Sequence, residues 1–552
     1  MEVNGYRVGP GANLYGVDLS FADLYGANLY DAILACADLS NTELSKANLS
    51  KANLANSNLC GANLSGVNLT EATLRYADLS GANLTGANLA NASSSESKMI
   101  YANLTSSNLS GAHLSDSSLI HANLTDANLT DANLVGADLA GANLTEANLT
   151  GTNFAGANLS GADMSRANLL HARLIGTIAL GEHPPDENLS RANPNGTSLL
   201  AAKMDGRSIS GAVFSGANFA GTFLKGVNFS DCNLSSANFE EVDLSDANLS
   251  GANLVDSRLG WSILERVNLE RANLQRTNLR SSNLKCANLR GANLESANLQ
   301  EAKLREANLV GCNLTSTDFA LADLTSADLR FVDLEGAILR NAFLINVNLS
   351  NANLKNANLS GSHFSGSTIT TGACFRGASL NFAEMFQANF DGIDLTDVLI
   401  READLRLASF LGSNLKRGDL TSSNLSMACL RDANLENACL EGVNLESGDI
   451  DNVNLYGANL KNSVLINAIL LNSNLGMANI EGADLSGCNA TGVNFKNANL
   501  RKANLTNANL KNANLDGSNL SDCNLVGANL PGFNLFDVNL TGATMPDGTI
   551  HP

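Results

Sequence analysis

Residues 126–160 read DANLTDANLVGADLAGANLTEANLTGTNFAGANLS, which is one five-residue phrase repeated seven times. In each phrase a small residue is followed by Asn or Asp, then by Leu or Phe, and the other two residues are mostly polar. We call the Leu or Phe position the centre and the small-residue position the small site. The phrase continues through nearly the whole chain, so the fold must be one in which a period of five makes physical sense.

A five-residue period suits neither an α-helix nor a flat β-strand. In a helix, successive centres would be rotated by about 140° from one another, so no apolar stripe would form. In a strand, successive centres would point to opposite faces because five is odd and side chains alternate. All centres can face one core only if the chain turns a corner in every phrase, and Asn, Asp, Gly and Ser suit such corners. The pattern therefore predicts a narrow tube with centres and small sites pointing inward.

The phrase resembles the motif of the pentapeptide-repeat family, in which a small residue, Asx and Leu are followed by two variable residues. Matching residues run from Gly11-Ala12-Asn13-Leu14 to Ala543-Thr544-Met545. The resemblance implies an all-β fold, namely a right-handed quadrilateral β-helix. This solenoid would have about four repeats in each coil and about 25 coils in this chain. The opening and closing segments, residues 9–14 and 545–549, are similar to those of cyanobacterial members.

Interruptions of the phrase predict the organisation of the chain. We expect an N-terminal cap at 1–11, a first repeat block at 12–174, an irregular interruption or loop at 175–208, a second block at 209–369, a one-residue phase slip at 370–374, a third block at 375–546 and a C-terminal tail at 547–552. The interruption holds Pro184 and Pro194 at centres, and proline cannot donate a ladder hydrogen bond. A functional loop and a solvated insertion without a role are both open interpretations.

Three smaller features predict local structure. Ser94 stands at a centre, which predicts a bulge or short loop at residues 93–98. The six-residue step from Ile369 to Phe375 predicts a bulge that re-aims the chain. Phenylalanine centres gather near the irregularities, and two pairs lie 20 residues apart, so each pair should stack between adjacent coils: Phe219 with Phe239, and Phe390 with Phe410.

The composition is acidic, with 54 Asp and Glu against 34 Lys and Arg and a net charge of −20. This charge argues against direct binding to nucleic acid or to an anionic membrane. Residues 1–6 lack the features of a signal peptide, and no apolar run approaches a membrane span, so we expect a cytoplasmic protein. Ten cysteines occur without a CxxC pair, and four stand in small sites, where they should be inert core residues: Cys232, Cys312, Cys488 and Cys523.

No constellation of residues points to catalysis. The six histidines form no metal-ligand spacing or catalytic dyad, and no phosphate loop, dinucleotide fingerprint or nucleophile elbow occurs. A solenoid core packed with Leu also offers no deep cleft. We therefore predict no enzymatic activity, no metal and no cofactor.

A basic cluster interrupts the acidic pattern in the middle of the chain. It comprises Arg258, Arg266, Arg271, Arg276, Arg280, Lys285, Arg290, Lys303 and Arg305. A 20-residue coil would stack Glu265 with Lys285 and Arg305, and Glu270 with Arg290, in weak cross-strand pairs. A solvated, partly paired face and a docking patch for an acidic partner are both open. For the docking patch, the candidate partner contacts are Trp261, which is the only Trp, and Arg266, Arg271, Arg276 and Arg290.

Both ends of a tube expose unpaired backbone, which must be covered. We expect Tyr6, Val8 and Pro10 to cap the N-terminal end. Four aromatic residues follow at outward positions, and we expect them to pack against this cap, with a partner surface as the alternative: Tyr15, Phe21, Tyr25 and Tyr30. Near the C-terminus, Phe533 and Phe536 predict an exposed aromatic end, and hence an end-to-end homodimer of the kind some family members form.

These observations favour a non-catalytic structural or scaffold rod that mediates protein–protein interaction through its side faces or the 175–208 segment, with an unknown partner. The alternative, which the family resemblance implies, is a DNA-mimicking regulator of a type II topoisomerase. A charge of −20 over about 25 coils is under one charge per coil, whereas duplex DNA carries about one per 1.7 Å. The low charge density favours the scaffold.

Overall fold

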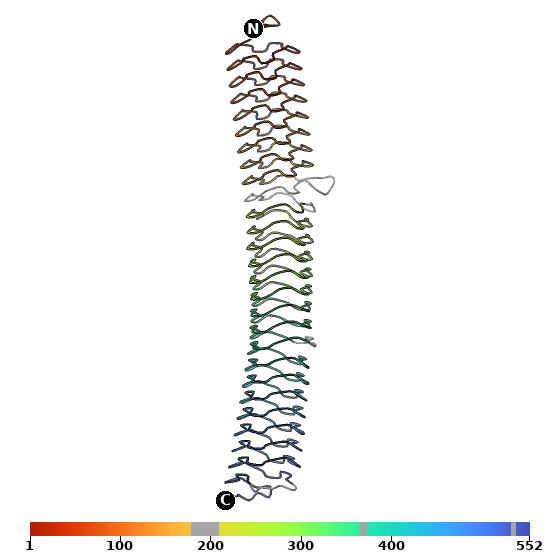
Figure 1. The fold of residues 1–552 in the computed structure, drawn as a ribbon, viewed down its shortest axis with the longest axis vertical. Helices are drawn as coiled ribbons and strands as arrows, with labels where there is room; N and C mark the ends of the chain where they lie inside the picture. The colour runs from red at the N-terminus through yellow and green to blue at the C-terminus, as the bar shows by residue number, and fades with distance from the viewer. Residues whose placement is uncertain (178–208, 365–371, 531–536) are drawn as a thin grey trace. The chain divides into compact units, whose positions relative to one another are not determined.

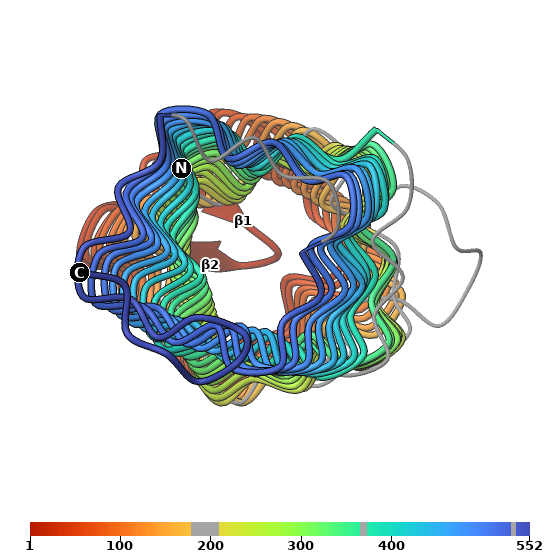
Figure 2. The same ribbon diagram turned by 90° about the horizontal axis from the view of Figure 1, so that it is seen from below.

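The computed structural model describes residues 1–177, 209–364, 372–530 and 537–552. The chain divides into two compact units, Met1–Asn278 and Leu279–Pro552. In each unit the chain winds as a right-handed quadrilateral β-helix, so the predicted fold class is confirmed, and the described residues contain no helix (Figure 1, Figure 2). None of the described residues forms a helix that could cross a membrane.

Successive coils are joined by parallel bridges between residues that are 20 positions apart. Asn108 bridges Asn128, and Asn128 bridges Asn148. The Asn128 amide donates to the Ser107 carbonyl at 2.9 Å, and the Leu129 amide donates to the Asn148 carbonyl at 2.8 Å. Each phrase thus hydrogen-bonds to the coil before it and to the coil after it, and four phrases complete one coil.

Each corner is a tight turn that the motif residues build themselves. The Asn128 side-chain oxygen accepts from the Thr130 amide at 3.2 Å, and the Ala132 amide donates to the Leu129 carbonyl at 2.9 Å. Asp131 then adopts the left-handed conformation, with φ 56°. This conformation disfavours β-branched side chains, and none of the described non-glycine residues with positive φ is Val, Ile or Thr. The corner turn therefore explains two features of the motif. Asx is required because its side chain accepts a hydrogen bond within the turn, and the last position tolerates any residue that can adopt a positive φ.

The core consists of the centres and small sites, as predicted. Leu centres such as Leu129 and Leu309 are 0% exposed, and the small sites beside them are similarly buried. Where a described small site is Ser or Thr, its hydroxyl donates to a backbone carbonyl, either three residues before it or in the previous coil. Ser107 Oγ, for example, donates to the Leu104 carbonyl at 2.7 Å, so a polar small site leaves no unpaired hydroxyl in the core.

The predicted bulge at residues 93–98 is wrong. Ser93 bridges both Thr73 and His113 at the regular spacing of 20, and Lys98 bridges Asp78 and Ser118. Ser94 occupies its centre in the core at 1% exposure, where its Oγ lies 2.9 Å from Ser97 Oγ. The two hydroxyls hydrogen-bond to each other, so the coil accepts a polar centre without bending.

The predicted phenylalanine stacks are confirmed. The rings of Phe219 and Phe239 are 4.4 Å apart and nearly parallel at 6°, and those of Phe390 and Phe410 are 5.1 Å apart at 5°. All four side chains are fully buried. Ring stacking along the tube axis therefore replaces the usual leucine stack at these coils.

In the second unit the bridge spacing changes locally from 20 to 21. Asn353 bridges Cys374, Asn358 bridges Ser379 and His363 bridges Glu384, whereas bridges on either side of this region return to 20. These three ladders thus continue across one additional residue, whereas residues 370 and 371 of the predicted phase slip lie outside the described residues. The predicted interruption at 175–208 lies outside the described residues, apart from residues 175–177.

A short antiparallel hairpin lies across the N-terminal end of the tube (Figure 1, Figure 2). Its strands are β1 (Glu2–Val3) and β2 (Tyr6–Arg7). Met1 and Val8 exchange backbone hydrogen bonds of 2.9 and 2.8 Å, and Val8 is 2% exposed. At the other end, Thr544 pairs antiparallel with Ile550. The predicted homodimer residues, Phe533 and Phe536, lie outside the described residues.

The expectation that Tyr15, Phe21, Tyr25 and Tyr30 pack against the cap is wrong. These side chains are 64, 77, 56 and 41% exposed. They stand in the corner turns and are exposed there, whereas the hairpin lies across the open end of the tube (Figure 2).

We predict that replacing one buried centre destabilises the second unit far more than replacing an exposed leucine. Leu309→Ala should cost about 2–5 kcal/mol, because it removes a fully buried side chain from a narrow core. Leu321 is 52% exposed with φ 62°, so Leu321→Asn should leave stability unchanged or slightly higher. Urea unfolding midpoints measure both effects, and equal midpoints for the two variants would contradict the assignment of centres.

We also predict that thiol reactivity separates the cysteines by position. Burial raises the pKa of the Cys232, Cys312, Cys488 and Cys523 thiols to about 12, whereas Cys36 and Cys286 are exposed. Because the thiolate is the reactive form, a thiol reagent near neutral pH should label Cys36 and Cys286 in the native protein. The four buried thiols should be labelled only after unfolding, as peptide mass spectrometry will show.

Candidate interaction surfaces

The structure disperses the residues that sequence analysis placed in one patch. Trp261, Arg266, Arg271 and Arg276 are the left-handed corner residues of four successive phrases, with φ of 56, 55, 57 and 56°. Because one coil has four corners, these side chains leave the first unit at four different corners. Trp261 is 54% exposed. Arg290 belongs to the second unit. Neighbours in sequence therefore do not form one face.

Five of the nine residues of the basic cluster form ion pairs with carboxylates of an adjacent coil: Arg258, Arg266 and Arg276 with the coil before, and Arg280 and Arg305 with the coil after. Arg266 Nε and Nη2 donate to the two carboxylate oxygens of Asp246 at 2.7 and 2.9 Å, and Arg276 binds Asp256 in the same way at 2.7 and 2.8 Å. These arginines lower the pKa of Asp246 and Asp256, chiefly by hydrogen bonding. This geometry favours the solvated, partly paired face. The predicted stacks of Glu265 with Lys285 and of Glu270 with Arg290 each pair a residue of the first unit with a residue of the second. They remain predictions.

The second unit carries a side on which the usual asparagine ladder is replaced. A typical ladder in the first unit runs Asn63, Asn83, Asn103, Asn123, Asn143. In the second unit one ladder of bridged residues reads Lys303, Asp323, Phe343, His363, Glu384, Asp404, Asn424. The outward position of this ladder thus changes from a uniform amide to charged and aromatic side chains.

Large apolar side chains are exposed along the same side. Phe382 and Phe386 lie two residues before and two residues after Glu384, in the turns at either end of this side. Leu407 and Met427 lie at the same corner as Phe386, one and two coils later, directly after Arg406 and Ser426. Phe343, Phe382, Phe386, Leu407 and Met427 are 40, 58, 36, 43 and 62% exposed. We call the surface made by these five residues with His363, Glu384, Asp404 and Arg406 the Phe386 face. Exposed apolar side chains gathered across consecutive coils mark an interaction site more strongly than isolated ones do.

Stacking and ion pairs hold the side chains of the Phe386 face in place. The His363 ring stacks on Phe343 with centroids 4.9 Å apart, and its Nδ1 lies 2.8 Å from a Glu384 oxygen. The Arg406 guanidinium binds Asp404 with two hydrogen bonds of 2.8 Å and lies 5.5 Å from the Phe386 ring centroid. These contacts order the surface before any partner arrives.

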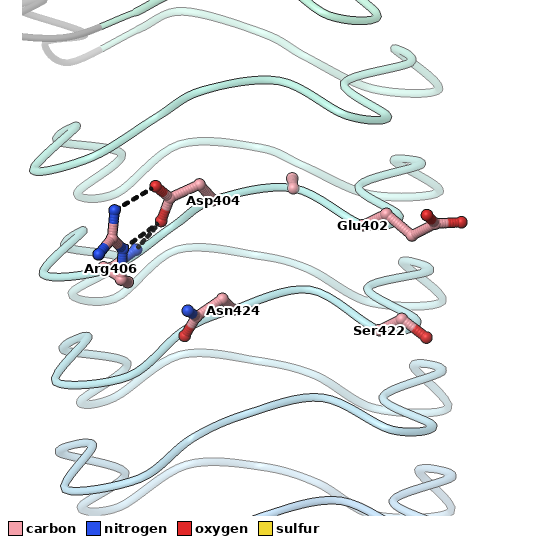
Figure 3. A pocket seen from close by; sticks show the side chains of 6 residues that line it. Glu402, Asp404, Arg406, Ser422 and Asn424 are labelled. Atoms are coloured by element: carbon pink, nitrogen blue, oxygen red, sulfur yellow. Dashed lines mark hydrogen bonds and ion pairs between the residues drawn. The ribbon is translucent and has the colours of Figure 1, made fainter.

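A shallow depression of about 510 Å³ opens on the Phe386 face. It is lined by Glu402, Ala403, Asp404, Arg406, Ser422 and Asn424. Figure 3 shows Arg406 turned onto Asp404 on one side of it and Glu402 on the other. The parts of the chain that the structure describes contain no group of three or more His, Cys, Asp or Glu that could hold a metal ion.

Comparison with known proteins assigns the family. The sequence profile described as "Pentapeptide repeats (8 copies)" matches overlapping ranges within 12–178, 195–366 and 388–476, and the profile "Pentapeptide repeat region" matches 458–535. The chain belongs to the pentapeptide repeat family. Proteins of this family are generally non-catalytic structural proteins. A search of the curated proteins found no match.

Solved structures of other pentapeptide repeat proteins are similar to this chain. HetL of the cyanobacterium Nostoc sp. strain PCC 7120, a protein involved in heterocyst differentiation regulation, is 29% identical; the match covers 58% of this chain and 93% of HetL, with a TM-score of 0.12. Rfr23 of the cyanobacterium Cyanothece 51142 is 26% identical over 33% of this chain and 89% of its own, with a TM-score of 0.13. QnrB1, a plasmid-mediated fluoroquinolone resistance protein, is 20% identical over 44% and 91%, with a TM-score of 0.18.

The Phe386 face forms no contiguous motif in the sequence, because its members are spread from Phe343 to Met427. One signal was available, since Phe343 and His363 replace the expected Asx 20 residues apart. The next rung follows after 21 residues, at Glu384. The two halves of this surface align only when the extra residue at the six-residue step from Ile369 to Phe375 is counted.

We predict that arginine–carboxylate pairs make stability depend on acid pH. Hydrogen bonding to Arg417 lowers the pKa of Asp397 from 3.8, so the pair stabilises the fold above the unfolded value and this contribution is lost as pH falls through the folded pKa. Arg417→Gln should lower the urea midpoint slightly at neutral pH, whereas near about pH 2 the variant and the wild type should converge. Arg340 lies in no ion pair among the described residues. Arg340→Gln should therefore have the same urea midpoint as the wild type at both pH values.

Proposed function

We propose that this protein is a non-catalytic scaffold that binds a protein partner through the Phe386 face. The observation that carries the proposal is the gathering of five exposed apolar side chains and one arginine over consecutive coils of a fold whose commonest ladder residue is asparagine. The regular β-helix supports these side chains on a rigid backbone.

The chemistry of the Phe386 face suits a protein surface as partner. Phenylalanine, methionine and arginine are enriched in protein–protein interfaces, whose cores are apolar and whose rims are polar. Here Phe382, Phe386 and Met427 supply apolar area, and Asp404 and Glu384 supply polar neighbours. Because His363 and Arg406 are already held by stacking and ion pairs, binding would cost less side-chain entropy than ordering free side chains.

The alternative, a DNA-mimicking regulator of a type II topoisomerase, receives less support. QnrB1 is a fluoroquinolone resistance protein, but its likeness to this chain concerns the fold alone. In this chain many carboxylates are neutralised by arginine, as in the pairs of Asp246, Asp256 and Asp397. A surface of alternating charge pairs does not reproduce the continuous negative charge of a DNA backbone.

The proposal is tested with variants that leave the fold intact. A partner captured from the native source by the full-length protein is identified, purified and titrated against wild type and the variant Phe382→Asn/Phe386→Ser/Met427→Asn. Asn suits the two left-handed corners at Phe382 and Met427, whose φ are 61 and 59°. We expect the triple variant to weaken binding by about tenfold or more, since buried interface aromatics dominate affinity.

Phe331 provides the matched control, because it is an exposed aromatic in the same unit, at 59% exposure and φ 59°, on another corner. Phe331→Asn should leave the affinity unchanged. Equal affinities for the wild type and the triple variant, or equal losses in the triple variant and the control, would contradict the proposal.

A further inference from the structure

The first complete coil of the protein carries an aromatic side chain at every corner. Tyr15, Phe21, Tyr25 and Tyr30 stand in the four successive turns between residues 15 and 31. All four are at least 41% exposed, and Phe21 reaches 77%. One coil later the same corner positions are Ala35, Asn41, Ser45 and Ser50. We call these four aromatic residues the N-terminal collar; it is confined to a single coil.

Two adjacent sides between these corners carry stacked carboxylates. Asp18 bridges Asp38 on one side, and Asp23 bridges Glu43 on the next. The other two sides carry neutral pairs, Asn28 with Asn48 and Asn13 with Ile33. Following the chain, the acidic sides alternate with aromatic corners in the order Tyr15, acidic pair, Phe21, acidic pair, Tyr25. The half of the first coil from Tyr15 to Tyr25 is therefore acidic and aromatic, whereas the sides of the other half carry neutral residues.

These carboxylates have no internal cation. Asp18 accepts the Ser20 amide at 2.9 Å, Asp38 accepts Asn58 Nδ2 at 3.0 Å and Glu43 accepts Asn63 Nδ2 at 2.8 Å. Among the residues that the structure describes, none of the four carboxylates lies in an ion pair, in contrast to Asp246 and Asp256. Within residues 1–45 the acidic residues are Glu2, Asp18, Asp23, Asp31, Asp38 and Glu43, and the basic residue is Arg7.

The collar already holds one cation of the protein itself. Lys46 Nζ lies 5.8 Å from the centroid of the Tyr25 ring. This contact has the geometry of a cation–π interaction, which stabilises an ammonium or guanidinium group over an aromatic face. The rings of Tyr15 and Phe21 stand in equally open corners.

We propose that the sector formed by Tyr15, Phe21, Tyr25 and the carboxylates of Asp18, Asp23, Asp38 and Glu43 docks a lysine- or arginine-rich segment of a partner protein. Each cationic side chain of such a segment pairs with a carboxylate and packs its head group or aliphatic stem against a neighbouring ring. Anionic lipid and nucleic acid are repelled by the same sector.

This surface belongs to the first unit and does not depend on the Phe386 face of the second unit. A chain with both surfaces has two docking sites of different chemistry, one apolar and one for cationic segments. The two proposals can fail separately, because their variants change different residues and are titrated with different probes.

The test uses full-length protein and a fluorescent ten-residue peptide of alternating Lys, Arg and Gly, with a matched peptide in which Gln replaces each basic residue. In the aromatic variant each ring is replaced by the residue at the same corner one coil later: Tyr15→Ala, Phe21→Asn and Tyr25→Ser. The carboxylate variant is Asp18→Asn/Asp23→Asn, which restores the common motif residue. The charge control is Asp138→Asn/Asp163→Asn, because these carboxylates hold the same motif position between corners that carry no aromatic residue.

Fluorescence anisotropy at physiological salt gives the dissociation constants. We expect wild type to bind the basic peptide and not the Gln peptide, and the aromatic and carboxylate variants each to weaken binding by about tenfold or more, the sum of a few contacts of this kind. The charge control should bind within about twofold of wild type. Unchanged binding in the aromatic variant, or an equal loss in the charge control, would show attraction to the net charge of the chain and overturn the proposal. Circular dichroism confirms that each variant keeps the fold.

Discussion

Every feature of this protein depends on the parallel hydrogen bonds that join residues 20 positions apart. They place each side chain directly beside its counterpart in the next coil, so that the outer surface is a set of ladders and the interior a set of stacks. A leucine stack inside and an asparagine ladder outside are both self-compatible, because apolar groups pack on each other and amides donate to and accept from each other. Asn128 and Asn108 show the second case, with Nδ2 of one 3.1 Å from Oδ1 of the other.

The same stacking is unfavourable for like charges, and the chain deals with this in two ways. In the middle of the chain, arginine stands one coil after aspartate at the corner, as in Asp246 with Arg266 and Asp397 with Arg417. In the first coils, carboxylates stack on carboxylates at Asp18 with Asp38, relieved only by neutral hydrogen-bond donors. Residual repulsion is a cost to folding that a cationic partner would remove, which gives the N-terminal collar a physical reason to bind.

A fold this regular expresses specificity where it departs from its own motif. Phe343 and His363 occupy positions at which asparagine would complete a ladder, and Phe382, Leu407 and Met427 occupy corners that Asn, Asp and Gly fill elsewhere. At the corners, the exposed apolar side chains of Phe382, Leu407 and Met427 stand on a left-handed backbone that Asn, Asp or Gly would adopt more easily. Departures from local rules without a local gain are the positions where function is expected. Both proposed surfaces contain such departures.

The sequence by itself determined the tube, its four-sided coil, the identity of the core residues and the ring stacks of Phe219 with Phe239 and Phe390 with Phe410. A period of five admits only one way to keep all centres inside. Other features of the protein were decided only by the tertiary structure. Ser94 stays in a regular coil because Ser97 lies within hydrogen-bond reach, which a propensity argument cannot know. Trp261, Arg266, Arg271 and Arg276 separate because each corner turns the chain to a new side. The Phe386 face assembles because the bridges count 21 residues at one place and 20 elsewhere. The six-residue step from Ile369 to Phe375 signals this extra residue, but the tertiary structure decides which apolar side chains are exposed together.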